Sequence, residues 1–344
     1  MNSNKKNSKV NYSMVSLGAM PPNVAVKGRP SRFGSLAVVA LIMALSSTGC
    51  GSTTSVQRAS TDAFSEVPED SSAEESSNWL VETTQEAVTQ ADRALAQGDL
   101  ERALYRYITA LELGDQSADT FYKIGLIHKQ KGNSAPAALA FEKAVDSDPG
   151  HAAAWEALGL LMLSDQQESR ARECLNMAIS LDPKLWRAYN GLGVIADMHR
   201  NKYLALYYYD FAVNIQSGSP LVFNNRGYSH YMAGDLDAAE RDFAMALQLD
   251  PDFSRGWQNL ALLEVRRENY EQAFRNLTRI MDAAAAYNDI GYLSMLAGRH
   301  DTAEKFFLES VRLSPSYNVA THENIDLNRE LRQLKESDFP GYGR

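Results

Sequence analysis

The sequence is poor in cysteine: its 344 residues contain only two, Cys50 and Cys174. Two cysteines cannot supply the several cross-links of a disulfide framework, so the fold has to be stabilised by packing. Cys174 lies in an amphipathic helical stretch, where we interpret it as a small buried filler. The sequence therefore excludes a fold held together by disulfides.

Long apolar runs are also missing. Leu36–Leu45 is an unbroken apolar run of ten residues, whereas a helix that crosses a bilayer needs about 20. Basic residues precede this run, and small residues follow it up to Gly49 and Cys50. A basic region, a short apolar run and a small-residue stretch are typical of a secretory signal, so we expect 1–49 to be a signal peptide.

The end of this signal resembles the lipobox of bacterial lipoproteins, in which the cysteine is acylated and the chain is cut just before it. The resemblance implies a lipid, palmitate included, on Cys50, and Gly51 in place of Asp implies transfer to the periplasmic side of the outer membrane of a Gram-negative bacterium. Ser47 stands where the family prefers Leu. An uncleaved anchor and ordinary signal cleavage are the alternatives, and the long basic leader also allows translation to start at Met14 or Met20.

Basic residues are scarce in the rest of the chain. The first 49 positions hold six basic residues and no acidic one, which leaves 28 basic against 43 acidic residues beyond them. Such a surface repels nucleic acid and offers nothing to anionic lipid headgroups. Gly51–Ser77 is rich in Ser, Thr and Glu, so we expect 50–77 to be the acylated cysteine followed by a disordered tether.

Motifs that would carry catalysis or hold a metal are lacking. The six histidines form no HExxH pair, no CxxC is present, and no glycine-rich phosphate loop follows a strand. We therefore expect a protein that is not an enzyme, with no metal, no cofactor and no small-molecule substrate.

The block Pro220–Phe253 shows what is present. It contains an aromatic residue at Phe223, Gly227 four residues later, a turn glycine at Gly234, and Phe243 between two alanines. Small residues allow two helices to approach closely, the turn glycine ends the first helix, and Phe243 fills the space between them. This is the pattern of the tetratricopeptide repeat (TPR), a helix–turn–helix unit of 34 residues.

The pattern recurs in register along the chain. The small residue at the eighth place of the block returns as Ala91, Gly125, Gly159, Gly193, Gly227 and Ala261. We predict an all-α TPR solenoid over 78–335, a right-handed superhelix of about seven repeats, in which the sixth repeat is four residues short. The predicted repeats are 84–117, 118–151, 152–185, 186–219, 220–253, 254–283 and 284–317, followed by a capping helix at 318–335 and a tail at 336–344.

Helical spacing places a set of polar and aromatic side chains on the concave side of such a stack, on the first helix of each repeat. Amides offer a donor and an acceptor to a partner backbone, and tyrosine and methionine offer apolar pockets. The candidate groove residues are Asn190, Asn224, Asn225, Tyr228, Tyr231, Gln258, Asn259, Asn288, Tyr292 and Met295. Alternatively, the amides brace neighbouring repeats and the tyrosines only fill space. A second candidate surface is Tyr203 with Tyr207, Tyr208 and Tyr209, of which we expect Tyr209 in the core and at most Tyr207 and Tyr208 outside.

The C-terminal stretches Tyr287–Tyr292, Leu313–Tyr317 and His322–Asn324 resemble the TadD family of Flp/Tad (tight adherence) pilus assembly lipoproteins, over roughly 84–335. The resemblance implies an adaptor or pilotin that helps a secretin, or other pilus assembly components, to assemble. Two alternatives stay open: a TPR lipoprotein that recruits peptidoglycan enzymes, and the secretin pilotin of type IVa pili.

Overall fold

The computed structural model describes residues 83–314 and 318–338. The regular secondary structure of these residues is helical throughout. The helices, in chain order, are α2 (Thr84–Ala96), α3 (Leu100–Glu112), α4 (Ala118–Gln130), α5 (Ser134–Ser147), α6 (Ala152–Ser164), α7 (Glu168–Leu181), α8 (Trp186–Met198), α9 (Lys202–Ile215), α10 (Pro220–Ala233), α11 (Leu236–Leu249), α12 (Ser254–Arg266), α13 (Tyr270–Leu277), α14 (Ala283–Leu296), α15 (His300–Leu313) and α16 (Val319–Asp338).

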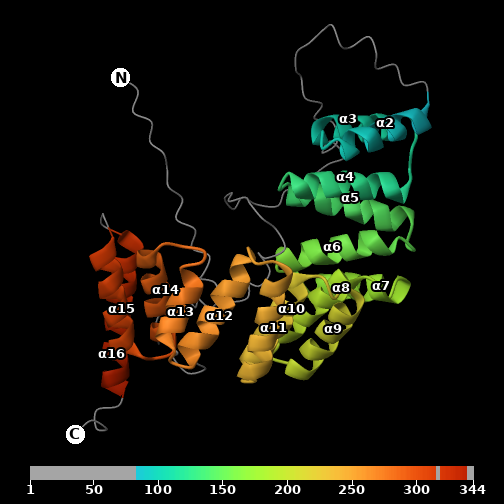
Figure 1. The fold of residues 1–344 in the computed structure, drawn as a ribbon. Helices are drawn as coiled ribbons and strands as arrows, with labels where there is room; N and C mark the ends of the chain where they lie inside the picture. The colour runs from blue at the N-terminus through green and yellow to red at the C-terminus, as the bar shows by residue number, and fades with distance from the viewer. Residues whose placement is uncertain (1–82, 315–317, 339–344) are drawn as a thin grey trace, which may run out of the picture. The chain divides into compact units, whose positions relative to one another are not determined.

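The described residues fall into two compact units that divide within α8, 83–192 and 193–338. In the N-terminal unit, α2 packs on α3, α4 on α5 and α6 on α7. In the C-terminal unit, α10 packs on α11, α12 on α13, and α14 on α15, and α16 covers α15 at the end. Figure 1 shows these pairs as neighbouring helices joined by short turns. The predicted all-α TPR solenoid fold is therefore confirmed.

Each pair is held by a small residue facing a large one. The large residues recur 34 residues apart in the first six repeats, and all are fully buried: Tyr107, Phe141, Leu175, Tyr209, Phe243, Leu277 and, in the seventh repeat, Phe307. Five of them lie against a glycine of the first helix: a Cβ on Gly125, Gly159, Gly193, Gly227 or Gly291 would lie 2.5, 2.7, 2.7, 2.9 or 2.6 Å from the nearest carbon of the large side chain. The helices can approach this closely only because the side chain is absent.

Local residues define where the helices begin and end. Asp99, Asp235 and Asp282 cap α3, α11 and α14 by accepting a hydrogen bond from a backbone N–H of the first turn. Gly234 ends α10 with φ +86°, a left-handed conformation that favours glycine. Two tryptophans at the same place of their repeats fix the preceding Asp-Pro turn: the indole N–H groups of Trp155 and Trp257 donate to proline carbonyls six residues earlier, each at 2.9 Å.

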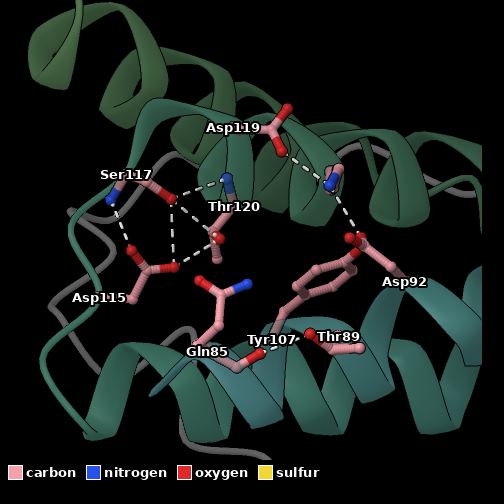
Figure 2. Close-up of polar contacts among 9 residues, drawn as sticks. Gln85, Thr89, Asp92, Tyr107, Asp115, Ser117, Asp119 and Thr120 are labelled. Atoms are coloured by element: carbon pink, nitrogen blue, oxygen red, sulfur yellow. Dashed lines mark hydrogen bonds and ion pairs between the residues drawn. The ribbon is translucent and has the colours of Figure 1, made fainter. Parts of the chain in front are cut away.

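A polar network ties the first repeat to the second in the N-terminal unit. Asp92 of α2 accepts hydrogen bonds from the Tyr107 hydroxyl on α3 and from Lys123 Nζ on α4, the latter at 2.8 Å (Figure 2). Lys123 also pairs with Asp119 at 2.7 Å. These contacts lower the pKa of Asp92 against the opposing effect of burial. The network fixes the register of α4 on the first pair.

A second group lies at the turn before α4. Asp115 accepts hydrogen bonds from the backbone N–H of Ser117 at 2.9 Å and from the Thr120 hydroxyl at 2.5 Å (Figure 2). Ser117 in turn caps α4. This turn therefore satisfies backbone donors that the start of a helix would otherwise leave unpaired.

The sixth repeat is shortened in its second helix. The α13 helix has 8 residues, whereas α11, its counterpart in the fifth repeat, has 14. The connection from α13 to α14 covers 278–282, similar in length to the connection 250–253 between α11 and α12.

The C-terminal helix α16 is longer than predicted, since it continues to Asp338 and includes the first residues of the expected tail. It is fastened to the seventh repeat by apolar and polar contacts, and its Ile325 packs in a buried cluster with Met295 and Phe307. Asn328 Nδ2 donates to the backbone oxygen of His300 at 3.0 Å, and Arg329 pairs with Glu304 at 2.9 Å. Such a helix can end the stack because its outer face is polar.

No helix within 83–314 and 318–338 combines the length and the apolar character needed to cross a membrane. The predicted signal peptide, Cys50, the tether and the expected start of helical structure near Asn78 lie outside the described residues. Those expectations stay predictions.

Candidate functional site

The ten candidate groove residues all lie on first helices of repeats, as the spacing predicts. Asn190 belongs to α8 in the N-terminal unit, and the other nine belong to α10, α12 and α14 in the C-terminal unit. Most of them are buried: Asn190, Asn224, Asn225, Tyr231, Gln258, Asn259 and Met295. Tyr228, Asn288 and Tyr292 are half-buried. Within its own unit, therefore, little of the amide surface faces solvent.

Three of these amides form hydrogen bonds between helices of successive repeats or with the C-terminal helix. Asn259 Nδ2 on α12 donates to Asn224 Oδ1 on α10 at 2.8 Å. At the end of the stack, Asn324 Nδ2 on α16 donates to Asn288 Oδ1 on α14 at 3.1 Å. A buried amide needs such a partner because an unpaired polar group would cost free energy. The structure thus shows the bracing contacts of the alternative interpretation, while the binding role of the amides stays a prediction.

The tyrosines divide into a packed pair and an exposed surface. The rings of Tyr228 and Tyr231 stack with centroids 6.0 Å apart. On α9, Tyr209 is fully buried as predicted, but Tyr203 is 78% exposed and Tyr207 is 54% exposed. The expectation that at most Tyr207 and Tyr208 point outward is wrong for Tyr203, because it lies in the first turn of α9, where its ring faces Lys202 (5.0 Å).

A pocket opens where three consecutive first helices end in the C-terminal unit. We call it the Arg266 pocket; its volume is about 270 Å³, and it is lined by Tyr231, Met232, Leu262, Val265, Arg266, Leu293, Leu296, Ala297 and Arg299. Tyr231 is one of the candidate groove residues, and Leu262 and Val265 lie on α12, the first helix of the next repeat. The structure therefore brings apolar positions from the ends of α10, α12 and α14 to one hollow.

Two arginines at this pocket were not among the predicted residues. Arg266 Nη1 donates to the backbone oxygen of Tyr231 at 2.7 Å, and Arg299 Nη1 donates to that of Val265 at 2.8 Å. Each arginine thus reaches back to the end of the preceding first helix, where carbonyl groups lack helical partners. The sequence signal that could have indicated them is a basic residue close to the end of a first helix.

Two carboxyl groups on first helices of the C-terminal unit are perturbed by burial. Asp197 on α8 accepts hydrogen bonds from the Ser229 hydroxyl at 2.7 Å and the Tyr209 hydroxyl at 3.0 Å. Burial raises the pKa of Asp197 to about 6, against the effect of these hydrogen bonds. Burial likewise raises the pKa of Asp289 on α14 to about 6. Both groups are charged at neutral pH at the expense of stability.

This perturbation predicts how stability depends on pH. A carboxyl whose pKa is higher in the folded state binds more protons there than in the unfolded chain, so the free energy of unfolding rises as the pH falls toward 5. The double variant D197N/D289N is the reference, because its amides do not titrate. Relative to this variant, the free energy of unfolding of the native protein should rise by about 1 kcal/mol per carboxyl from pH 7 to pH 5. Urea unfolding at pH 7, 6 and 5 measures this difference. A difference that is the same at all three values would contradict the assignment.

Histidine, cysteine and acidic residues are side chains that could hold a metal ion or act as a nucleophile. Among the described residues, no group of three or more His, Cys, Asp or Glu side chains is placed to hold a metal ion. Cys174 is buried, as interpreted from the sequence, and burial raises the pKa of its thiol to about 11.

Protein-family models match four parts of the chain. Models described as tetratricopeptide repeat match 122–185, 220–253 and 284–317, and one described as TPR repeat matches 91–132. The matches at 220–253 and 284–317 coincide with the blocks recognised from the sequence. The matched models describe a repeat scaffold, and none of them describes an enzyme.

Individual proteins resemble the chain over a wider range. A peroxisomal targeting signal receptor of Eremothecium gossypii is 28% identical over 236 residues, covering 62% of this chain and 39% of the receptor. The chain thus spans less than half the length of this curated relative.

Solved structures share the fold. A tetratricopeptide repeat protein from Parabacteroides merdae ATCC 43184 has a TM-score of 0.53 at 16% identity, covering 72% of this chain and 98% of that one. PilW, described as a widely conserved type IV pilus biogenesis factor, has a TM-score of 0.50 at 17% identity, covering 60% and 97%. At such identities these likenesses show the fold alone.

Proposed function

We propose that this chain is a non-enzymatic adaptor in the assembly of a Flp/Tad-type pilus secretion system. It is a tetratricopeptide-repeat protein, and this fold mediates protein–protein interaction. The observation that carries the protein-binding part of the proposal is the Arg266 pocket, in which three consecutive repeats contribute apolar side chains to one hollow. A concave, mostly apolar hollow with a few polar groups is where a partner segment gains the most binding free energy.

The anchoring part of the proposal is supported by the sequence. Gly49 and Cys50 follow a short apolar run, and Gly51 comes next. An acylated Cys50 would hold the protein at the periplasmic side of the outer membrane, since two or more acyl chains give stable attachment. The 27 residues of Gly51–Ser77 would separate the repeats from the lipid surface by roughly 30 Å if they behave as a flexible chain.

The pilus part is supported by the three C-terminal stretches that resemble the TadD family. In this role the protein acts passively: the lipid sets its location, the tether gives reach, and the repeats hold a segment of a secretin subunit or of another assembly component. The fold it shares with a type IV pilus biogenesis factor is compatible with this role.

The proposal predicts a specific defect in a bacterium that encodes this chain. Deleting its gene should leave secretin subunits present while detergent-resistant secretin multimers and surface pili are lost. The native gene should restore both, whereas C50S should restore neither, because the unacylated protein is no longer held at the membrane. Immunoblots of multimers and electron microscopy of pili measure these outcomes. Normal multimers and pili in the deletion strain would refute the proposal.

The direct partner is identified by a photo-crosslinking amino acid at Met232, which is 49% exposed at the edge of the pocket. The matched control is the same amino acid at Leu308, which is 52% exposed on α15. We expect crosslinks to a secretin or another pilus component from position 232 only. Crosslinks to peptidoglycan hydrolases would favour the alternative scaffold, and crosslinks to a type IVa secretin would favour the type IVa pilotin.

A further inference from the structure

The Arg266 pocket combines an apolar floor with a cationic edge. Its floor consists of side chains from two first helices, and Leu262, Val265 and Leu293 are each at most 5% exposed. The edge is more open, since Met232 is 49% exposed there. A hollow of this kind can bury one large apolar side chain without rearranging the core, because its floor is already packed against the helices beneath.

Arg266 stands at the edge in a fixed position. Its guanidinium lies over the Tyr231 ring, 4.8 Å from the ring centroid, and Nη1 donates to the Tyr231 backbone oxygen at 2.7 Å. Arg266 pairs with no carboxylate among the residues that the structure describes. Stacking on the Tyr231 ring and hydrogen bonding to the Tyr231 backbone oxygen and side chain orient the guanidinium. An oriented guanidinium binds a carboxylate well.

Arg299 contributes mainly by positioning. Its Nη1 and Nη2 donate to the backbone oxygens of Val265 and Arg266, at 2.8 and 3.3 Å, and Nη2 pairs with Glu268 at 3.1 Å. Arg299 therefore holds the end of α12, and its charge is balanced by Glu268. The uncompensated positive charge at the pocket is that of Arg266.

From this geometry we infer that the pocket binds a segment of a partner protein in which a carboxylate side chain stands next to a large apolar side chain. The apolar side chain enters the hollow and the carboxylate accepts hydrogen bonds from Arg266. Charge complementarity supports this occupant, because the guanidinium of Arg266 is oriented at the edge of the pocket and has no carboxylate partner among the described residues. The inference rests on the proposed protein-binding role and adds the chemistry of the partner.

The test begins with a phage library of random 12-residue peptides selected on the full-length acylated protein in detergent. We expect enrichment of peptides with Asp or Glu beside Leu, Ile, Met or Phe. One selected peptide is then synthesised with blocked ends in two forms, one with Glu and one with Gln at the acidic position. Isothermal titration should show that R266Q weakens binding of the Glu peptide about tenfold and that of the Gln peptide less than twofold, the ratio expected for one charge-assisted hydrogen bond.

Two control variants separate this effect from general damage. R312Q removes a surface arginine on α15 that pairs with Glu309, and it should leave the affinities for both peptides unchanged. M232S shortens the apolar edge and should weaken binding of both peptides by the same factor. Equal melting temperatures of the three variants establish that each one folds.

Other outcomes overturn the inference. Equal affinities of the two peptides, equal effects of R266Q on both, or a selection without acidic residues would each reject the carboxylate. Phe64 and Val67 lie close to Glu66 and Glu69 in the sequence. If the peptides bind only after Phe64 and Val67 have been substituted, the pocket is occupied by this chain's own segment. Self-association that R266Q abolishes would assign it to a second copy. In all of these cases the proposed adaptor role would still stand or fall on the secretin and pilus measurements.

Discussion

Replacing Phe243 by Ala is expected to lower the free energy of unfolding by about 3–5 kcal/mol, the range for deleting a fully buried aromatic side chain. Phe243 is 0% exposed and sits between the two helices of the fifth repeat. Its neighbours include Gly227, which has no side chain, and Ala239, which is also fully buried. Because these small residues cannot move in to fill the space, most of the cavity would stay open.

The matched control is Phe211→Ala on α9, where the same side chain is 41% exposed. Urea unfolding followed by far-UV circular dichroism measures both variants, and we expect a loss below about 1 kcal/mol for Phe211→Ala. The loss at Phe243 would be a large fraction of the total stability of an ordinary domain, so a partly unfolded C-terminal unit at room temperature is also expected. Equal losses in the two variants would show that Phe243 is not the packing centre of its repeat.

Gly125→Ala is expected to destabilise the N-terminal unit by about 1–3 kcal/mol, although alanine is the better helix former by about 1 kcal/mol. A Cβ at this position would lie 2.5 Å from Cε1 of Phe141, closer than two carbon atoms can approach. Phe141 is fully buried, so its ring has little room to move away. The pair α4 and α5 would have to separate.

Gly218→Ala is the matched control, because the nearest atom to its Cβ would be the flexible Gln216 Nε2 at 3.9 Å. This variant should change the free energy of unfolding by less than about 0.5 kcal/mol. Thermal unfolding of both variants, followed by circular dichroism, measures the difference. A Gly125→Ala protein as stable as the native one would mean that the first and second helices of this repeat are not held at the distance described.

The repeat architecture could be predicted because each repeat depends on local residues. Gly234 adopts the left-handed conformation that a turn glycine indicates, and Phe243 and Tyr209 fill their helix pairs as their places in the block predict. These features are set within one block of 34 residues, so a single sequence is sufficient to recognise them.

The candidate site was predicted only in part. Counting along the helix correctly placed Asn224 and Tyr231 on a first helix, because helical spacing fixes the direction of each side chain. Counting did not indicate that Asn224 accepts a hydrogen bond from Asn259 of the next repeat, nor that Arg266 stacks on Tyr231. Those contacts join residues about 35 positions apart, so they depend on how one repeat is stacked on another.

The sequence by itself determined the helical repeats, their register and the packing residues inside each pair, because all of these follow from the spacing of small, aromatic and turn residues along one chain. Only the tertiary structure decided which polar side chains are buried in contacts between repeats and which are exposed. A side chain's exposure depends on the neighbouring repeat that covers it, as the buried Asn259 and the exposed Arg266 of the same helix show.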